Sequence, residues 1–415
     1  MSTQSFSALG ASETVCAALA QRGISAPFPI QELVLPDALA GRDVLAKSPT
    51  GSGKTIAFAI PMVERIARDA KVPAGLVLVP TRELAMQVAD ETAALARSKG
   101  LRVATAFGGV GIHGQAQKAA RSHILVDTPG RLEDLIERRL VRLDAVSLLV
   151  LDEADRMLDL GFRPAVDRIV NQVRQERQTL FFSATLDGEV NRISSRYTRD
   201  AVKVEHETPE AEIGHIEHRF MTTRHDEKLD RLVDVLAGER ELALVFVRTK
   251  RGASRLATRL EHRGVRVAAL HGDMTQSQRT RSLERFSRGH ADTLVATDVA
   301  ARGLDIDAIT HVVNFDPPDD DPSYVHRSGR TGRAGRSGTS ITLVLDDQRE
   351  AVSKMAVLAG VDEPRCERTD TPLMVPGLRN QGNSPARRKQ QQMAQQRPAA
   401  RQGEWRRDQP RSRAR

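Results

Sequence analysis

Short runs of apolar residues recur along most of the chain, separated by stretches with the spacing of helices. Near-continuous apolar strands of this kind are typical of parallel sheets covered by helices on both faces. We expect a first series of strands at Asp43–Ala46, Leu76–Val79, Val103–Ala106, Ile124–Val126, Leu148–Leu151 and Thr179–Phe182. We expect a second series at Leu242–Val247, Val265–Leu270, Thr293–Ala296, His311–Asn314 and Ser340–Leu345. The pattern therefore predicts an α/β protein with two parallel sheets.

A polar stretch with little periodicity, Glu205–Ile213, divides the two series of strands. We therefore expect one domain over residues 1–205, a linker over 206–213 and a second domain over 214–362. Within the second domain, Thr275 and Gln278 have the spacing of a capping box, which predicts that a helix begins there. From about Asp362 onward Pro, Gln, Arg, Gly and Ser dominate, so we expect residues 363–415 to form a disordered tail.

The composition narrows the class of protein. The chain has 415 residues, of which 40% are hydrophobic and 28% charged, as in a soluble protein of two domains. No apolar run approaches the roughly 20 residues of a membrane span, and the N-terminus has no pattern of a secretion signal. Cys16 and Cys366 lack metal-ligand spacing, so we expect two reduced thiols in a cytoplasmic protein.

The formal net charge of +8 is concentrated at the C-terminal end. Residues 378–415 hold eleven Lys or Arg against Glu404 and Asp408, so the rest of the chain is close to neutral. A basic tail on a near-neutral body favours a polyanionic partner.

A glycine-rich segment follows the first predicted strand, where Ser48–Thr55 reads Ser-Pro-Thr-Gly-Ser-Gly-Lys-Thr. Glycines allow several backbone N–H groups to face one anion, and the helix expected next adds the positive end of its dipole. Lys54 would then reach the outer phosphates of a nucleotide, and the Thr55 hydroxyl would bind Mg²⁺. The strict phosphate-loop pattern requires glycine at Ser48, so an ordinary glycine-rich turn stays open as the alternative.

Two carboxylates follow the apolar run Leu148–Leu151, because residues 152–155 read Asp-Glu-Ala-Asp. A carboxylate at the end of a parallel strand projects into the crevice where ligands bind in open α/β sheets. Asp152 is the natural holder of Mg²⁺, and Glu153 is placed to act as general base on the attacking water. On its own such a segment is most often a solvated loop, but a phosphate loop upstream in the same domain favours a nucleotide site.

With its further motifs the chain resembles the DEAD-box ATP-dependent RNA helicases, of the bacterial RhlE-like type, over roughly Phe6 to Leu345. After the phosphate loop, the motifs of the first half stand in the family's order at Pro80–Ala85, Gly108–Gly109, Thr128–Arg131, Asp152–Asp155 and Ser183–Thr185. Those of the second half are Val245–Thr249, Gln276 with Arg279, Ala296–Asp305 and His326–Arg333. The resemblance implies two tandem RecA-like domains, each a mostly parallel sheet with helices on both faces, with ATP between them and RNA across both.

The resemblance also implies a role for each matching residue. Nucleotide contacts are implied for Phe6, Gln31, Thr50, Gly51, Ser52, Gly53, Lys54, Thr55 and Asp305, with Thr55 and Asp152 on Mg²⁺. Catalysis is implied for Lys54, Glu153 and two arginine fingers, Arg330 and Arg333. Coupling of the nucleotide site to the RNA face is implied for Ser183, Thr185, Asp155, His326 and Arg327. Ile24 stands where the family usually has an aromatic and Phe28 replaces a small hydroxyl residue, so we expect softer selectivity for ATP, although Gln31 is intact.

RNA is expected to be held by its backbone without reading of sequence. The matching contact residues are Arg82, Gly109, Thr128 and Arg131 in the first domain and Arg248, Thr249, Gln276, Arg279, Thr297 and Asp298 in the second. The basic tail would form a second RNA-binding segment, in which Trp405 could stack on a base. Its affinity for RNA should fall as the salt concentration rises. We expect proteins of ribosome assembly or RNA decay as further partners, and no membrane contact.

Two alternatives stay open at this point. A DNA translocase shares the two-domain engine, and an RNA-binding scaffold that has lost turnover shares the fold. The Asp-Glu-Ala-Asp run favours RNA over DNA, and intact Lys54, Glu153, Arg330 and Arg333 favour an active enzyme.

Overall fold

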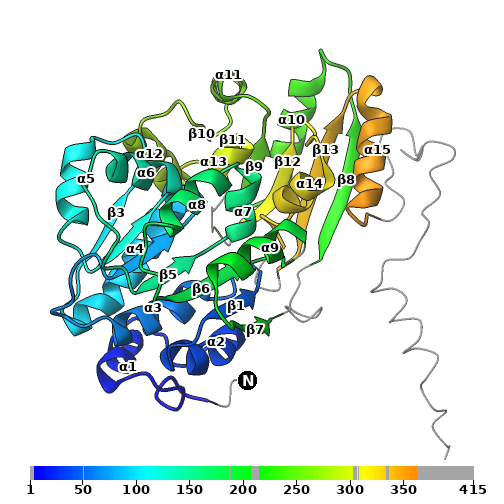
Figure 1. Cartoon of the computed structure of the whole chain (residues 1–415). Helices are drawn as coiled ribbons and strands as arrows, with labels where there is room; N and C mark the ends of the chain where they lie inside the picture. Colours follow the sequence, from blue (N-terminus) through cyan, green and yellow to red (C-terminus); the bar gives the residue numbers. More distant parts are fainter. Residues whose placement is uncertain are drawn as a thin grey trace, which may run out of the picture.

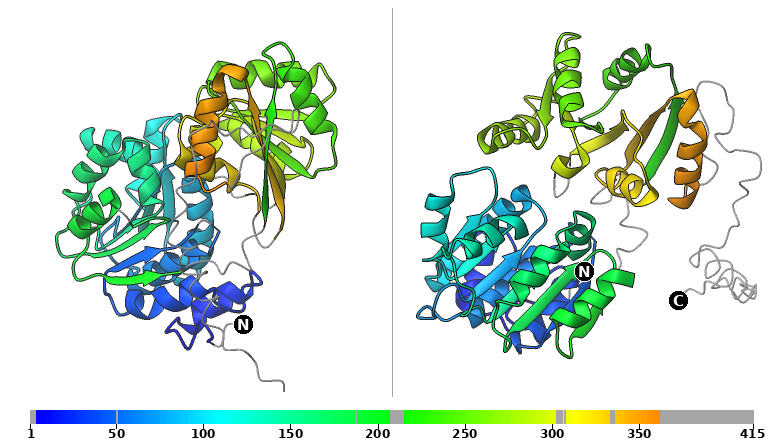
Figure 2. Two further views of the ribbon diagram at one scale, coloured as in Figure 1. Left: turned by 90° about the vertical axis from the view of Figure 1, so that its right-hand side faces the viewer. Right: turned by 45° about the horizontal axis from the view of Figure 1, so that its top comes forward.

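The protein folds into two α/β domains, one after the other along the chain (Figure 1). The structure is a computed structural model and describes residues 4–49, 51–186, 188–206, 215–301, 306, 308–332 and 336–361. The predicted linker falls almost entirely outside these residues, and so does the predicted basic tail. Seen from two further directions, the domains are separate bodies that face each other (Figure 2).

The first domain is built on a parallel sheet of seven strands in the order β3-β4-β2-β5-β6-β1-β7. Its strands are β1 (Val44–Lys47), β2 (Gly75–Leu78), β3 (Val103–Ala106), β4 (Ile124–Asp127), β5 (Leu148–Leu151), β6 (Gln178–Ser183) and β7 (Val202–Glu205). Its helices are α1 (Glu13–Ala20), α2 (Pro29–Leu39), α3 (Lys54–Arg65), α4 (Arg82–Ala96), η1 (Arg97–Lys99), α5 (Ile112–Ala119), α6 (Pro129–Glu137), α7 (Ala154–Asp159), α8 (Arg163–Val170) and α9 (Gly188–Tyr197).

The second domain repeats this plan with a parallel sheet of six strands in the order β10-β11-β9-β12-β13-β8. Its strands are β8 (Ile216–Thr222), β9 (Leu242–Phe246), β10 (Val267–Leu270), β11 (Thr293–Ala296), β12 (Ile309–Asn314) and β13 (Gly338–Val344). Its helices are α10 (Lys228–Ala237), α11 (Lys250–Glu261), α12 (Gln276–Ser287), α13 (Asp298–Ala301), α14 (Asp321–Ser328), η3 (Asp346–Gln348) and α15 (Arg349–Leu358).

Both sheets are covered on both faces, which explains why their central strands are apolar throughout. Along β2, for example, Leu76 and Leu78 belong to one buried cluster while Val77 belongs to the cluster on the opposite face. Successive side chains of a strand point to opposite faces, so a strand buried on both sides has no polar positions to alternate with. The predicted fold class, two parallel sheets with helices on both faces, is confirmed.

Local signals set where several helices begin. The Thr275 hydroxyl accepts from the backbone N–H of Gln278, and the Gln278 side chain accepts from the N–H of Thr275 at 2.8 Å. This reciprocal capping box is the predicted one, and it satisfies donors that the first turn of α12 would otherwise leave unpaired. Among the helices of the described segments, none is both long and apolar enough to cross a bilayer.

Candidate functional site

The phosphate loop joins β1 to α3 and has the geometry that its glycines allow. Gly51 and Gly53 have φ values of 81° and 87°, in the left-handed region that other residues rarely adopt. Lys54 is 7% exposed and donates from Nζ to the carbonyl oxygens of Ser48 at 3.0 Å and Pro49 at 2.7 Å. Its ammonium group is therefore held at the mouth of the loop, where it can exchange a carbonyl for a phosphate oxygen. Thr50 lies outside the described residues.

Gln31 and Phe28 connect the start of α2 to this loop. The Gln31 side chain accepts from the backbone N–H of Phe28 and donates to the carbonyl of Gly53, both at 2.9 Å. Phe28 packs beside the α-carbon of Gly53, yet 57% of its side chain is exposed. By contrast Phe6, for which the resemblance implied a nucleotide contact, is 4% exposed within the hydrophobic core and does not line the cavity described below.

The carboxylates stand at the end of β5, two strands away from β1 at the same edge of the sheet. Asp152 is 3% exposed, and burial raises its pKa to about 7, although Lys54 opposes this rise. Glu153 has a left-handed backbone with φ of 50°, a strained conformation of the sort that concentrates at functional sites. Its Oε2 atom is buried and has no hydrogen-bond partner among the described residues.

The strand between them, β6, links the phosphate loop to the carboxylates through its last residues. The backbone N–H of Ser48 donates to the carbonyl of Ser183 at 2.9 Å. One residue further, the N–H of Ala184 donates to the Asp155 carboxylate at 3.2 Å. Hydrogen bonds donated by backbone N–H groups thus connect the end of β6 to the phosphate loop through Ser183 and to the carboxylate motif through Asp155. Both residues were predicted to couple the nucleotide to the RNA face. Thr185, predicted with them, is exposed.

These segments surround a cavity of about 510 Å³ that receives side chains from both domains. The first domain contributes Gln31, Gly51, Gly53, Lys54, Thr55, Asp152 and Glu153 to its lining, and the second contributes Arg330. Arg330 is 4% exposed and follows α14. The other predicted contributions of the second domain, Asp305 and Arg333, lie outside the described residues.

The chemistry of the cavity fits a magnesium nucleotide. Asp152 is buried with a raised pKa, and the buried Glu153 Oε2 atom has no hydrogen bond in the described residues, although Arg156 Nε lies 4.0 Å away. Both carboxylates favour a cation or a water at this place. Gly51 and Gly53 have the left-handed φ values that allow successive backbone N–H groups to face one anion. Thr55 and Asp152 are the oxygen donors placed to hold Mg²⁺, which prefers few protein carboxylates together with phosphate oxygens.

A second cavity, of about 360 Å³, opens between the domains and is lined by arginines. Arg82 and Arg131 of the first domain reach it together with Arg279 of the second. Burial and the neighbouring Arg279 lower the pKa of Arg82, Glu83 opposes this fall, and Arg131 adds to it. Glu83 also lines the cavity and pairs with Arg279, but three guanidinium groups beside one carboxylate leave an excess of positive charge. A bound anion stabilises such a cluster, and planar guanidinium suits phosphate oxygens.

The remaining residues predicted to contact RNA in the first domain surround this cavity. Gly109 has φ of 82°, which favours glycine, and the end of the Arg82 side chain packs against its α-carbon. Thr128 lines the cavity, and its backbone N–H donates to Asp127 at 2.7 Å. Arg131 donates to the carbonyl of Val110 at 3.1 Å, which holds the glycine loop against α6.

The residues predicted to contact RNA in the second domain differ in whether their side chains contact the first domain. Arg279 is buried and forms an ion pair of 2.7 Å with Glu83 across the domain interface. Gln276 also reaches across, with its amide 3.9 Å from the sulfur of Met86. The Asp298 carboxylate, which borders the interface, accepts from both Nε and Nη2 of Arg327 at 2.6 Å.

Two further members of the set lie at the start of α11. Thr249 caps this helix by accepting from the N–H of Gly252 at 3.0 Å, and exposed Arg248 pairs with Asp319 at 2.8 Å. Thr297 is 7% exposed beside α13. His326 shares a small hollow with Arg156 of the first domain, so the segment predicted to couple the two sites does lie at the interface.

Three residues of the interface or its surroundings were given no role of their own from the sequence, although Glu83 lies within the motif Pro80–Ala85. Glu83 and Arg156 are first-domain residues whose interface positions depend on how the domains face each other, which no local pattern shows. Asp127 is fully buried at the end of β4, and burial raises its pKa well above the usual range. Its place directly before the Thr128–Arg131 motif was the available signal.

Comparison with known proteins agrees with this geometry. The DEAD/DEAH box helicase family matches residues 28–193, and the helicase conserved C-terminal domain matches residues 225–335. A DEAD-box ATP-dependent RNA helicase CshA of Streptococcus pneumoniae is 44% identical over 348 residues, covering 83% of this chain and 66% of that protein. The ATP-dependent RNA helicase CshA of Limosilactobacillus reuteri is 41% identical over 361 residues, covering 86% and 72%. The chain thus spans about two thirds of the length of these relatives.

Solved structures give the same result. S. cerevisiae Dbp5 bound to RNA and ADP BeF3 has a TM-score of 0.77 at 29% identity, covering 87% of this chain and 95% of that one. A DEAD box protein from Methanococcus jannaschii has a TM-score of 0.50 at 34% identity, covering 87% and 99%. With both halves matched in order and the nucleotide and arginine cavities in place, the chain belongs to the DEAD-box family of ATP-dependent RNA helicases.

Proposed function

We propose that this protein is an RNA-gated ATPase that opens short RNA duplexes or removes proteins from RNA. The observation that carries the proposal is the composition of the nucleotide cavity. Its binding groups come from the first domain, whereas Arg330 comes from the second. Hydrolysis that requires both sets of groups can proceed only when the domains have closed on each other.

RNA is the ligand proposed for the arginine-lined cavity. Its three guanidinium groups come from both domains, so a strand bound there would favour the same closed arrangement that completes the nucleotide site. The similarity over 87% of the chain to a Dbp5 structure with RNA and ADP BeF3 supports an arrangement in which both ligands are bound together. Because each ligand favours closure, each should raise the affinity for the other by the same factor.

The residues of the chain divide the chemical work. Lys54 leaves the carbonyls of Ser48 and Pro49 to contact the outer phosphates, while Glu153 orients a water and accepts its proton. Arg330 neutralises charge that develops on the transferring phosphoryl group. Thr55 and Asp152 would hold Mg²⁺, which would neutralise charge on the phosphate oxygens.

The extent of unwinding follows from the energy of a duplex. Opening one base-pair step of DNA costs about 1.4 kcal/mol, and we take RNA to be similar. A single closure of the two domains can therefore open only a few base pairs. We therefore expect local strand separation without long travel along the RNA.

The proposal is tested by steady-state ATPase assays with RNA and with DNA of the same sequence. We expect RNA to stimulate hydrolysis strongly and DNA little. Glu153→Gln, which keeps the size of the side chain but removes the base, should lower RNA-stimulated kcat by about 10² or more. Equal stimulation by DNA would favour a translocase, and equal activity of the Gln variant would refute the assigned chemistry.

A further inference from the structure

An exposed row of arginines runs along α11, outside both cavities. Arg251, Arg255 and Arg259 follow one another at intervals of four residues and are all exposed. The opposite face of the helix is apolar and buried through Ala253, Leu256 and Leu260. Four residues advance a helix by about 6 Å and rotate it by only about 40°, so the three guanidinium groups form a continuous stripe.

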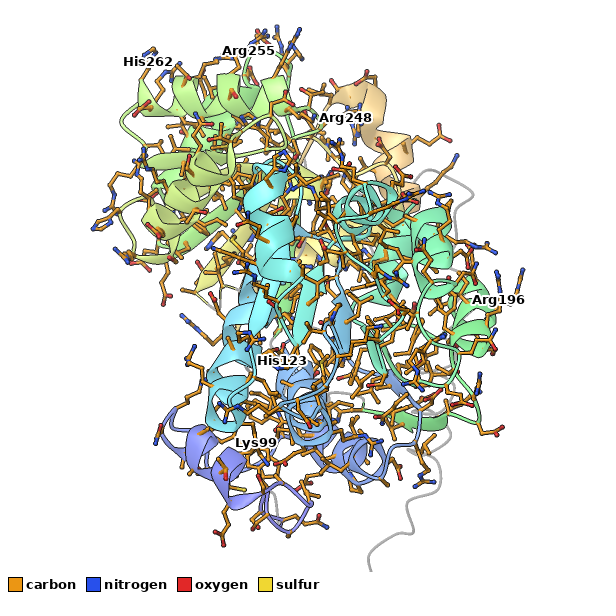
Figure 3. All side chains as sticks on the ribbon, turned by 60° about the vertical axis from the view of Figure 1, so that its left-hand side comes forward. Lys99, His123, Arg196, Arg248, Arg255 and His262 are labelled. Carbon is orange, nitrogen blue, oxygen red and sulfur yellow. The ribbon has the colours of Figure 1, made fainter. Side chains whose placement is uncertain are left out.

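The stripe has little internal counter-charge, although the Asp273 carboxylate, which pairs with Lys250, also interacts electrostatically with Arg251. None of its three arginines forms an ion pair with a residue that the structure describes, although neighbouring basic residues do so. Lys250 pairs with Asp273 at 2.8 Å, and Arg263 pairs with Asp230 at 2.7 Å. In Figure 3, Arg255 and His262 point away from the body of the second domain, into solvent. Three unpaired positive charges on one rigid face suit a polyanion with regularly spaced charges.

The start of α11 adjoins the arginine-lined cavity between the domains. Gly272 lines that cavity, and the Lys250 side chain lies against Gly272, 3.1 Å from where a Cβ would stand. One turn further, the Ser254 hydroxyl and His271 Nε2 are 2.7 Å apart. A strand that leaves the cavity past Gly272 therefore meets the first turns of α11 and then the stripe.

We propose that Arg251, Arg255 and Arg259 hold the phosphate backbone of RNA that extends beyond the clamp. The inference rests on the proposed function, because it takes the strand in the arginine-lined cavity to be RNA. The basic tail of the chain is not a suitable occupant, because it carries the same sign of charge. The stripe would lengthen the footprint on RNA without taking part in hydrolysis, and it would read no sequence because it reaches only phosphates.

The test measures how RNA affinity depends on salt in the full chain. The triple variant R251Q/R255Q/R259Q is compared with R97Q/R121Q/R192Q, which removes the same charge from exposed arginines of the first domain. Two RNA probes are used: a short oligoribonucleotide that only fills the clamp and a long one with single-stranded extensions at both ends. For the long RNA, the stripe variant should bind about tenfold more weakly at low salt. Its slope of log affinity against log salt should be shallower by about 2, or about 0.7 for each lost phosphate contact.

The short RNA, the control variant and kcat at saturating RNA and ATP should stay as in the wild type. An unchanged salt slope for the long RNA would overturn the proposal. The stripe would then be a candidate binding site for an acidic protein. Equal weakening for short and long RNA would also overturn it, because the stripe would then belong to the clamp itself. If the wild type showed no RNA-stimulated ATPase, the proposed function would fail, whereas the stripe would still be judged on the difference in slope.

Discussion

Phe28 occupies the nucleotide cavity with more than half of its side chain exposed, where it packs beside Gly53. An exposed aromatic ring beside a phosphate loop offers a flat surface for a base, and base–aromatic stacking contributes about 1–3 kcal/mol. The sequence showed that Phe28 replaces a small hydroxyl residue, but only the structure shows that its ring borders the cavity that Ile24 also lines.

Phe28→Ala should therefore raise the KM for ATP about fivefold or more while kcat changes little. Inhibition by inorganic tripolyphosphate, which has no base, should be unaffected. Leu33→Ala is the matched control, because Leu33 is an exposed apolar residue of α2, the helix that follows Phe28, and does not line the cavity. Equal KM values for ATP in wild type and Phe28→Ala would show that the ring does not contact the base.

Asp127 is the second residue whose chemistry the fold alters. One carboxylate oxygen accepts from the Thr128 N–H, while the other is buried without a partner in the described part of the chain. Burial raises the pKa well above its ordinary 3.8, against the opposing effects of the Thr128 N–H and Arg131. The folded state then binds a proton more tightly than the unfolded state, so stability falls as pH rises from the unfolded pKa through the folded one.

Asp127→Asn keeps the acceptor for Thr128 but carries no charge. At pH 8 the variant should be more stable than the wild type by about 1 kcal/mol, and this gain should disappear as pH falls toward 4. Urea unfolding at a series of pH values measures the difference. A stability difference that does not change with pH would contradict the raised pKa.

Among elements, the central strands and two of the edge strands, β3 and β10, could be predicted, whereas the other two edge strands could not. The apolar runs at Leu148–Leu151 and Thr293–Ala296 coincide with β5 and β11, because a strand buried on both faces has a continuous apolar sequence. The prediction missed β7 and β8, which lie at the edges of their sheets. In β7 the order Val-Lys-Val-Glu alternates half-buried and exposed positions, as a short strand with one covered face does. Such four-residue alternation is too short to distinguish from a loop.

Two helices meet across the domain interface through Glu83 of α4 and Arg279 of α12. Both side chains are about 6–7% exposed, so removal of one partner would leave a buried charge unless the domains separate. When the domains separate, the remaining charge returns to water. Loss of one partner should therefore destabilise the closed arrangement of the domains, and it should not unfold either domain.

Glu83→Gln should lower the factor by which a non-hydrolysable ATP analogue raises RNA affinity, by about tenfold or 1.4 kcal/mol. Asp90→Asn removes the same charge from an exposed position of α4 and should leave this factor unchanged. RNA titrations with and without the analogue give the factor for each variant. An unaltered factor in Glu83→Gln would show that the ion pair does not contribute to closure.

At the scale of the whole molecule, the two domains complete one site. The sequence could place Lys54, Asp152 and Glu153 together, because they follow strands whose ends meet at one edge of a parallel sheet. Local sequence patterns could not show which residue of the second domain reaches these three side chains. That depends on how the two domains face each other (Figure 2). The same reason explains why Arg279, predicted as an RNA contact, lies in an ion pair with Glu83 as well as at the edge of the arginine-lined cavity.

The most direct test of this account is single-turnover ATP hydrolysis by Arg330→Ala at saturating ATP and RNA. Arg330 is the second-domain residue that lines the nucleotide cavity. Arg336→Ala provides a control a few residues further, where the exposed side chain pairs with Glu241. We predict that Arg330→Ala lowers the hydrolysis rate about 10³-fold with little change in ATP affinity, whereas Arg336→Ala behaves as the wild type. A rate for Arg330→Ala within tenfold of the wild-type rate would contradict a site completed by domain closure.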